Sequence, residues 1–268
     1  VYITKFVKSI YHKKEIEMSE ISQSNSDYSF SADLNQKSEN SQNRLFEKLI
    51  KGKSSKNIQL IYIWGVFLFL TGISILAQIL YPAEFSIITH TISQQGSIKE
   101  NPIGSIIWRI GVVFNGLGHI PHILFIKHQL HKIHPRKANR LKIVGIIAAI
   151  GFSFVGFFSI EYGFLHDFVA LIAFWGYYFT ANFSFNILNK ELDSENYSKL
   201  NLKKIRSFSI YYSIYFNISG ALCLLSFLIN RIFLGGDVWP PVEWNYLIAI
   251  CIWLLFWPWV VKALGKKE

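Results

Sequence analysis

The sequence predicts an all-α polytopic membrane protein with six transmembrane helices and with both termini in the cytoplasm. Three observations support this prediction: the low share of charged residues, six long apolar runs, and the distribution of Lys and Arg between these runs. Of the 268 residues, 51% are hydrophobic, 16% are aromatic and only 16% are charged, whereas soluble globular chains carry about 25% charged residues. This composition excludes a soluble globular domain, a fibrous protein and a disulfide-stapled secreted module.

Each of the six apolar runs is long enough to cross a bilayer as a helix. A hydrocarbon core about 30 Å thick needs roughly 20 apolar residues, and within the runs the only charged residue is Arg109 in the second. Only helices and closed barrels satisfy the backbone in lipid, and barrel strands would be shorter and would alternate apolar with polar residues. The predicted spans cover residues 58–81, 103–126, 143–160, 168–188, 208–230 and 244–261.

The distribution of Lys and Arg predicts the orientation. The segment before the first span, the two loops that follow the second and fourth spans, and the tail after the sixth span contain 24 of the 27 Lys and Arg residues. Because cytoplasmic loops carry this excess, these segments are expected to face the cytoplasm. The net charge of +10 therefore indicates contact with anionic lipids of the inner leaflet. A nucleic-acid partner is not expected, because no basic-aromatic binding module is present.

The predicted domain of residues 58–264 follows a segment of different composition, residues 1–57. This segment is expected to be a cytoplasmic tail, disordered where Ser, Asn, Gln and Asp dominate. Arg44–Lys56 is expected to act as a basic topology anchor, with a short amphipathic surface helix as the alternative. The chain opens with Val1 and its only Met is Met18, which leaves two alternative starts. The oligomeric state stays open.

Polar residues inside a span are expensive in lipid and therefore mark candidate sites. One face of the second span carries small and polar residues, namely Gly104, Trp108, Gly111, Asn115, Gly118, His119 and His122. This stripe either packs closely against neighbouring helices or lines a cavity, and Pro121 is expected to break the helix between the two histidines. The two imidazoles suggest metal or haem ligation, but the other spans offer no His at this depth. No metal or other cofactor is therefore predicted.

The outward ends of the spans carry most of the other candidate residues. Arg109 is expected to lie about 10 Å inside the outer boundary, at 1.5 Å per residue, where a guanidinium must meet an anion or reach the headgroups. The candidate ligand-binding residues are Arg109, Ser93, Gln94, Trp108, Asp167 and Asn115, and the candidate catalytic residues are His166 and Glu161.

These residues support three interpretations. In the first, Arg109 holds the phosphate of a lipid headgroup, His166 and Glu161 orient it, and the loop around Ser93 acts as a lid. In the second, His166 is the base of a membrane-embedded acyltransferase or lipid hydrolase. In the third, Arg109 forms a structural pair with a carboxylate and closes the bundle. A small-solute transporter is a further alternative.

Short motifs between Tyr81 and Leu188 resemble those of a known group of membrane proteins. The motifs are Thr91-Ile92-Ser93-Gln94-Gln95-Gly96, then Pro102, then Ile107-Trp108-Arg109, and later Glu161 with Leu165-His166. They resemble the Frag/DRAM/Sfk superfamily of six-pass membrane proteins and the related prokaryotic six-pass family of unknown function. The superfamily pattern falls on Ile92, Ser93, Gly96, Pro102, Trp108, Arg109 and His166, although relatives often carry an acidic residue where this chain has Gln94. The resemblance implies the handling of membrane lipids rather than one defined reaction.

Overall fold

The computed structural model describes residues 42–192, 200–233 and 239–264, and within these ranges it contains helices and no strands. Six helices are long and apolar enough to cross a membrane, which confirms the predicted all-α class and the number of candidate spans. They are α2 (Lys56–Ile79), α3 (Gly104–His131), α4 (Pro135–Phe157), α5 (Phe164–Leu192), α6 (Leu200–Ser226) and α7 (Pro240–Leu264). Two short 3-10 helices (Ser93–Gly96 and Ile160–Tyr162) lie in connecting segments, and a π-helix (Phe227–Phe233) continues α6.

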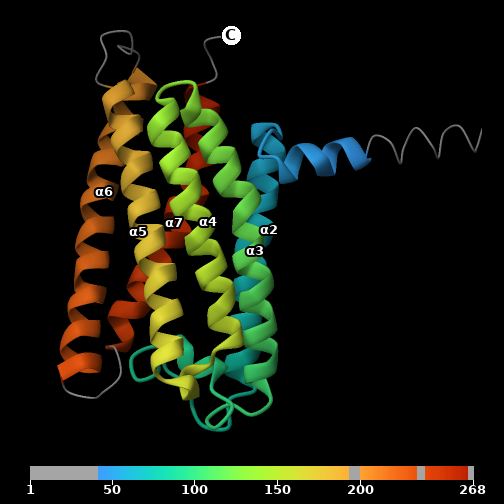
Figure 1. The fold of residues 1–268 in the computed structure, drawn as a ribbon, viewed down its shortest axis with the longest axis vertical. Helices are drawn as coiled ribbons and strands as arrows, with labels where there is room; N and C mark the ends of the chain where they lie inside the picture. The colour runs from blue at the N-terminus through green and yellow to red at the C-terminus, as the bar shows by residue number, and fades with distance from the viewer. Residues whose placement is uncertain (1–41, 193–199, 234–238, 265–268) are drawn as a thin grey trace, which may run out of the picture. The chain divides into compact units, whose positions relative to one another are not determined.

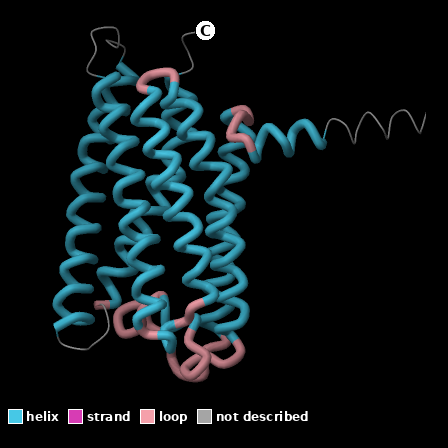
Figure 2. Tube along the Cα trace, in the orientation of Figure 1, coloured by secondary structure: helices cyan, strands magenta, loops and turns pink. Residues whose placement is uncertain are grey.

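The six long helices run along the length of the bundle (Figure 1), and their contacts connect them in a closed ring. Each long helix packs against its neighbour in sequence, and α7 also packs against α2 and α3. The segments 80–103 and 158–163 lie together at one end of the bundle, which we call the loop end (Figure 2). The turn at 132–134 lies at the opposite end, which we call the basic end, because basic residues flank this turn.

Several helices begin before the apolar runs from which they were predicted, whereas α2 and α4 end two and three residues before the predicted ends at 81 and 160. The third span was expected to begin at residue 143, whereas α4 begins at Pro135 with His134 as its N-cap. The fourth span was expected to begin at residue 168, whereas α5 begins at Phe164. Apolarity marks only the part of a helix inside hydrocarbon, whereas caps and prolines set where the helix begins.

The expectation that Pro121 breaks its helix was wrong. Helix α3 continues through this residue from Gly104 to His131. A proline leaves a backbone carbonyl without its helical donor, and in membranes side chains of neighbouring helices supply replacements. The carbonyl that lacks its helical donor is that of Leu117, and at the next residue the Tyr62 hydroxyl of α2 donates to the Gly118 carbonyl at 2.6 Å.

Close contacts explain the stripe of small residues on α3. A Cβ atom on Gly111 of the stripe would lie 2.2 Å from Ile73 of α2, and one on Gly116, which lies outside the predicted stripe, would lie 2.3 Å from the Ser153 hydroxyl oxygen of α4. Because no larger residue fits there without displacing a neighbour, α3 can approach α2 and α4 closely. This part of the stripe packs against helices and does not line a large cavity.

The outward faces of the bundle carry many large apolar side chains. Ile61 and Tyr211 are each 74% exposed, and Leu68 is 60% exposed. A water-soluble protein would cover so much apolar surface, whereas lipid chains solvate it in a bilayer. The fold is therefore that of an integral multi-pass membrane protein.

Before the bundle, residues 42–50 form a helix. Arg44–Lys56, which was expected to be a basic topology anchor with a short surface helix as the alternative, is thus helical in its first part, while Lys56 already belongs to α2. The expected disordered tail before residue 42 lies outside the described residues.

Candidate functional site

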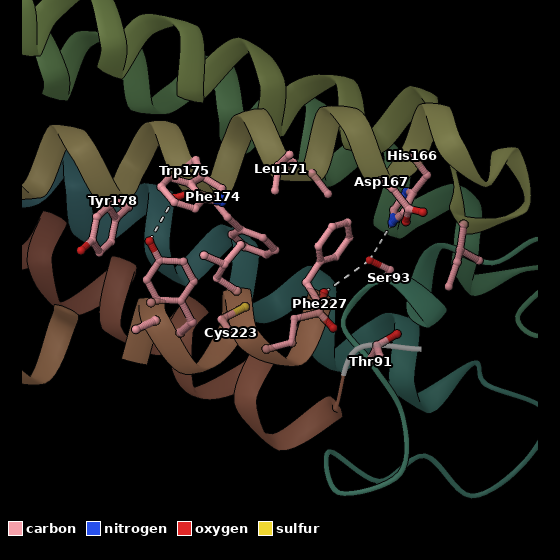
Figure 3. A pocket seen from close by; sticks show the side chains of 17 residues that line it. Thr91, Ser93, His166, Asp167, Leu171, Phe174, Trp175, Tyr178, Cys223 and Phe227 are labelled. Carbon is pink, nitrogen blue, oxygen red and sulfur yellow. Dashed lines mark hydrogen bonds between the residues drawn. The ribbon is translucent and has the colours of Figure 1, made fainter. Parts of the chain in front are cut away.

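A partly open pocket of about 170 Å³ lies between α5, α6 and α7 at the loop end. Its polar end is formed by Thr91, Ser93, His166, Asp167 and Glu243, as Figure 3 shows for the four labelled ones. Apolar and aromatic side chains line the rest, including Leu171, Phe174, Trp175, Tyr178, Leu224 and Phe227. Concave, mostly apolar sites with a few convergent polar groups are typical of small-molecule binding.

The apolar lining on α5 follows the helical period. From His166 at the polar end, the lining residues recur about every turn, at Ala170 and Leu171, at Phe174 and Trp175, and at Tyr178. At 1.5 Å per residue this face extends about 18 Å along the helix axis. The lining therefore runs from the loop end toward the middle of the bundle.

The imidazole of His166 lies between two oxygen atoms. Its Nδ1 is 2.7 Å from the Phe158 carbonyl oxygen, and its Nε2 is 3.0 Å from the Ser93 hydroxyl oxygen. A carbonyl oxygen can only accept, so Nδ1 carries a proton. In the neutral ring Nε2 is then an acceptor facing the Ser93 hydroxyl.

Glu243 adds a carboxylate that sequence reasoning missed. Its Oε2 accepts a hydrogen bond from the Ile92 amide at 3.2 Å, and its Oε1 accepts one from the Ser93 hydroxyl at 3.4 Å. The side chain is only 5% exposed. It lies in the first turn of α7, where the helix dipole favours a negative charge. This position is just before the span predicted from residue 244. The acidic residue after Pro240 and Pro241 was the signal that could have identified it.

Arg109 is half-buried and does not line the pocket. Its Nε donates to the Gly156 carbonyl at 2.9 Å, and its Nη2 donates to the Phe157 carbonyl at 2.9 Å. These carbonyls belong to the last turn of α4, which has no intrahelical donors for them and carries the negative end of the helix dipole. Helix-end carbonyls therefore meet the guanidinium where we expected a phosphate or a protein carboxylate.

Glu161 also lies apart from the pocket, in the segment between α4 and α5. Its Oε1 accepts hydrogen bonds from the Ser97 hydroxyl at 2.6 Å and from the Lys99 amide at 3.1 Å. Burial raises the pKa of this carboxyl, but hydrogen bonds from neighbouring hydroxyl and amide groups outweigh burial and lower the pKa to about 2. Glu161 therefore joins the segments 80–103 and 158–163 at the loop end.

The other three predicted residues have packing roles. The Gln94 side-chain oxygen accepts from the Thr91 amide at 2.6 Å, which closes a turn. Trp108 is 3% exposed. Asn115 donates to the Val66 carbonyl at 2.8 Å, while its own Oδ1 is buried without a hydrogen-bond partner among the described residues. Asn115 also borders a cavity of about 10 Å³, about the size of one water molecule.

His119 and His122 each bond to groups of the protein. His119 bonds to the Tyr177 hydroxyl of α5. His122 is fully buried, and its Nε2 lies 2.8 Å from the Leu254 carbonyl. Its Nδ1 accepts from the Gln59 side-chain amide at 2.9 Å. Among the described residues, no group of three or more His, Cys, Asp or Glu side chains is placed to hold a metal ion.

The structure thus brings together three of the predicted site residues, Ser93, His166 and Asp167, and adds Thr91 and Glu243. Of the remaining predicted residues, Arg109 bonds to the end of α4, Gln94 and Glu161 bond within the loops, and Trp108 and Asn115 are buried inside the bundle. Comparison of the chain with models of known protein families, with curated proteins and with solved structures found no match.

Proposed function

We propose that this integral membrane protein binds a membrane lipid in the pocket between α5, α6 and α7, and that it acts in lipid remodelling or organisation. The observation that carries the proposal is the division of the pocket into a polar end at the loop end and an apolar lining that extends along α5. A lipid has the same division, since its headgroup stays near the interface while its acyl chain extends toward the membrane centre. The resemblance to the Frag/DRAM/Sfk superfamily agrees with this proposal.

The polar end favours a particular headgroup chemistry. Two carboxylate side chains, Asp167 and Glu243, line it together with His166 and Ser93, and no Lys or Arg is among the described lining residues. Carboxylates attract ammonium groups and accept from hydroxyl groups, but they repel phosphate. We therefore expect a headgroup that presents an amine or hydroxyl to this end, in place of a phosphate held by Arg109.

The distribution of Lys and Arg supports an orientation in which the loop end faces outward. The polar end would then face the outer leaflet, and its lipid would enter from that leaflet. The basic end would contact anionic lipids of the inner leaflet.

Solute transport is less well supported. A polar solute needs polar groups along its whole route, because unsolvated polar groups are expensive in hydrocarbon. Beyond the polar end, Leu171, Phe174 and Leu224 line the pocket with apolar surface. This lining is suited to an acyl chain.

Two substitutions on α6 test the proposal. Ala221 lines the pocket, whereas the neighbouring Leu222 is 48% exposed and is not among the lining residues. Ala221→Phe should fill the pocket and remove most of the lipid that co-purifies with the protein, as measured by native mass spectrometry. Leu222→Phe is the matched control and should retain the lipid. Equal lipid retention by the two variants, at equal thermal stability, would contradict the proposal.

A further inference from the structure

We propose that Ser93 is a nucleophile and His166 its general base, so that the pocket cleaves or transfers the acyl group of an ester. This inference rests on the proposed function, since it needs an acyl chain in the same pocket. It goes beyond lipid binding because it assigns a covalent reaction and a nucleophile.

The first support is the geometry of the two side chains. The Ser93 hydroxyl oxygen lies 3.0 Å from Nε2 of His166 although the residues are 73 positions apart in the sequence. An activated serine requires a base within about 2.6–3.2 Å, and the base must itself be oriented by a third group. The Phe158 carbonyl, 2.7 Å from Nδ1, is that third group. It fixes the tautomer in which the lone pair of Nε2 can accept the serine proton.

The second support is where the pair lies. Both side chains line the polar end of the pocket (Figure 3). His166 is only 4% exposed. An ester carbonyl placed at Ser93 would have its acyl chain along Leu171 and Phe174 and its alcohol portion at the loop end.

Glu243 completes the arrangement as a positioning residue. Its bond to the Ile92 amide holds the backbone next to Ser93. Its Oε1 accepts from the Ser93 hydroxyl at 3.4 Å, a longer contact than the 3.0 Å between that hydroxyl oxygen and Nε2 of His166. The carboxylate therefore places a negative charge near the imidazolium that forms when His166 takes the proton. An adjacent carboxylate stabilises a protonated imidazole.

The proposed reaction is balanced in atoms and electrons. The Ser93 oxygen attacks the ester carbonyl carbon and forms a C–O bond, while the hydroxyl proton passes to Nε2 of His166. The bond between the carbonyl carbon and the alcohol oxygen then breaks, and His166 returns the proton to the departing alcohol. Water or an acceptor alcohol next attacks the acyl-serine, with its proton passing through His166 to the Ser93 oxygen. The net change is ester hydrolysis or acyl transfer, with no oxidant or reductant.

The test uses two probes on the full-length purified protein in nanodiscs. A fluorophosphonate should modify Ser93, detected as a mass increase on the peptide that contains it. A medium-chain p-nitrophenyl ester should be hydrolysed, with the nitrophenolate followed by absorbance. Ser93→Ala should abolish both signals, and His166→Gln should lower ester turnover by about 100-fold or more, within the range for loss of a general base.

Controls separate catalysis from folding and from binding. Ser86→Ala, in the same loop but outside the pocket lining, should leave both signals unchanged. Ser93→Cys keeps a nucleophile at this position and should retain measurable turnover where Ser93→Ala does not. Equal ester turnover by Ser93→Ala and the unsubstituted protein would overturn the catalytic assignment. If the fluorophosphonate leaves Ser93 unmodified in protein that still co-purifies with lipid, the catalytic assignment is overturned while the proposed lipid binding stands. The Ala221→Phe variant tests lipid binding separately.

Discussion

Arg109 and His166 bond to successive carbonyls at the C-terminal end of α4. Arg109 bonds to those of Gly156 and Phe157, and His166 bonds to that of Phe158. Carbonyls at a helix end have no intrahelical donors, and lipid supplies none. The two side chains therefore share one structural element, although only His166 also lines the pocket.

Replacing Arg109 should affect stability more than lipid binding. Arg109→Ala removes two charge-assisted hydrogen bonds, each worth about 1.5–3 kcal/mol before relaxation, and should lower the thermal unfolding midpoint. Arg109→Lys keeps the charge and should recover part of the loss. Lipid in the pocket should remain, as measured by native mass spectrometry. Selective loss of that lipid in Arg109→Ala at unchanged thermal stability would instead assign Arg109 to headgroup binding.

Glu161 predicts a specific dependence of stability on pH. Because the pKa in the folded protein is about 2, below the ordinary value of 4.5, this carboxylate stabilises the fold above about pH 4.5. That contribution is lost as the pH falls from 4.5 toward 2. It should be about 1 kcal/mol, since solvent screens this exposed group.

The measurement is the thermal unfolding midpoint across that pH window. Glu161→Gln should reduce the fall of the unfolding midpoint between pH 4.5 and pH 2. Glu84→Gln, at an exposed carboxylate of the 80–103 segment, should leave that fall unchanged. A Glu161→Gln profile parallel to that of the unsubstituted protein from pH 4.5 to pH 2 would refute this assignment.

At the scale of helices, a buried polar chain joins α2, α3 and α7 near the basic end. The Ser54 hydroxyl donates to Gln59, the Gln59 amide donates to His122, and His122 donates to the Leu254 carbonyl. Pro258 lies inside α7 and supplies no N–H for the carbonyl four residues earlier, which is that of Leu254. His122 thus replaces the donor that α7 lacks at its proline.

This interpretation predicts an energetic coupling between two helices. His122→Leu should destabilise the protein by about 1–3 kcal/mol, because the Leu254 carbonyl and the Gln59 amide lose a partner. In the Pro258→Ala background the cost should be smaller, because the new backbone N–H at position 258 can donate to Leu254. A double-mutant cycle of unfolding free energies measures the difference. Purely additive effects would show that His122 does not replace the backbone donor that Pro258 lacks.

At the scale of the whole molecule, the ring of helices places the pocket at one end. Three helices contribute its walls, and the 80–103 segment contributes Thr91 and Ser93. This position allows access from the lipid and from the interface, provided that the loop end faces outward as the positive-inside rule predicts.

The orientation can be measured on intact cells. Single cysteines at Lys99, at the loop end, and at Lys132, at the basic end, would be introduced after Cys223→Ala and Cys251→Ala. A membrane-impermeant maleimide should label Lys99→Cys in intact cells and Lys132→Cys only after permeabilisation. The reverse pattern would place the pocket at the cytoplasmic face.

The sequence by itself determined the class of fold. Long uncharged runs predict spanning helices because a bilayer leaves few alternatives, and the structure has six candidate spans. The sequence also marked Ser93, His166 and Asp167 as candidate site residues, and the structure places all three in the lining of one pocket.

The tertiary structure alone decided which polar residues share a site. Arg109 and His166 both lie toward the outward ends of their predicted spans, yet of the two only His166 lines the pocket. Glu243 enters the same site from α7, far along the chain, and no local pattern pairs it with Ser93. Hydropathy reports how deep a residue lies, but the packing of helices sets the direction in which its side chain points and the partner it meets. Helix rotation and neighbour choice therefore separated the residues that line the pocket from those that stabilise the bundle around it.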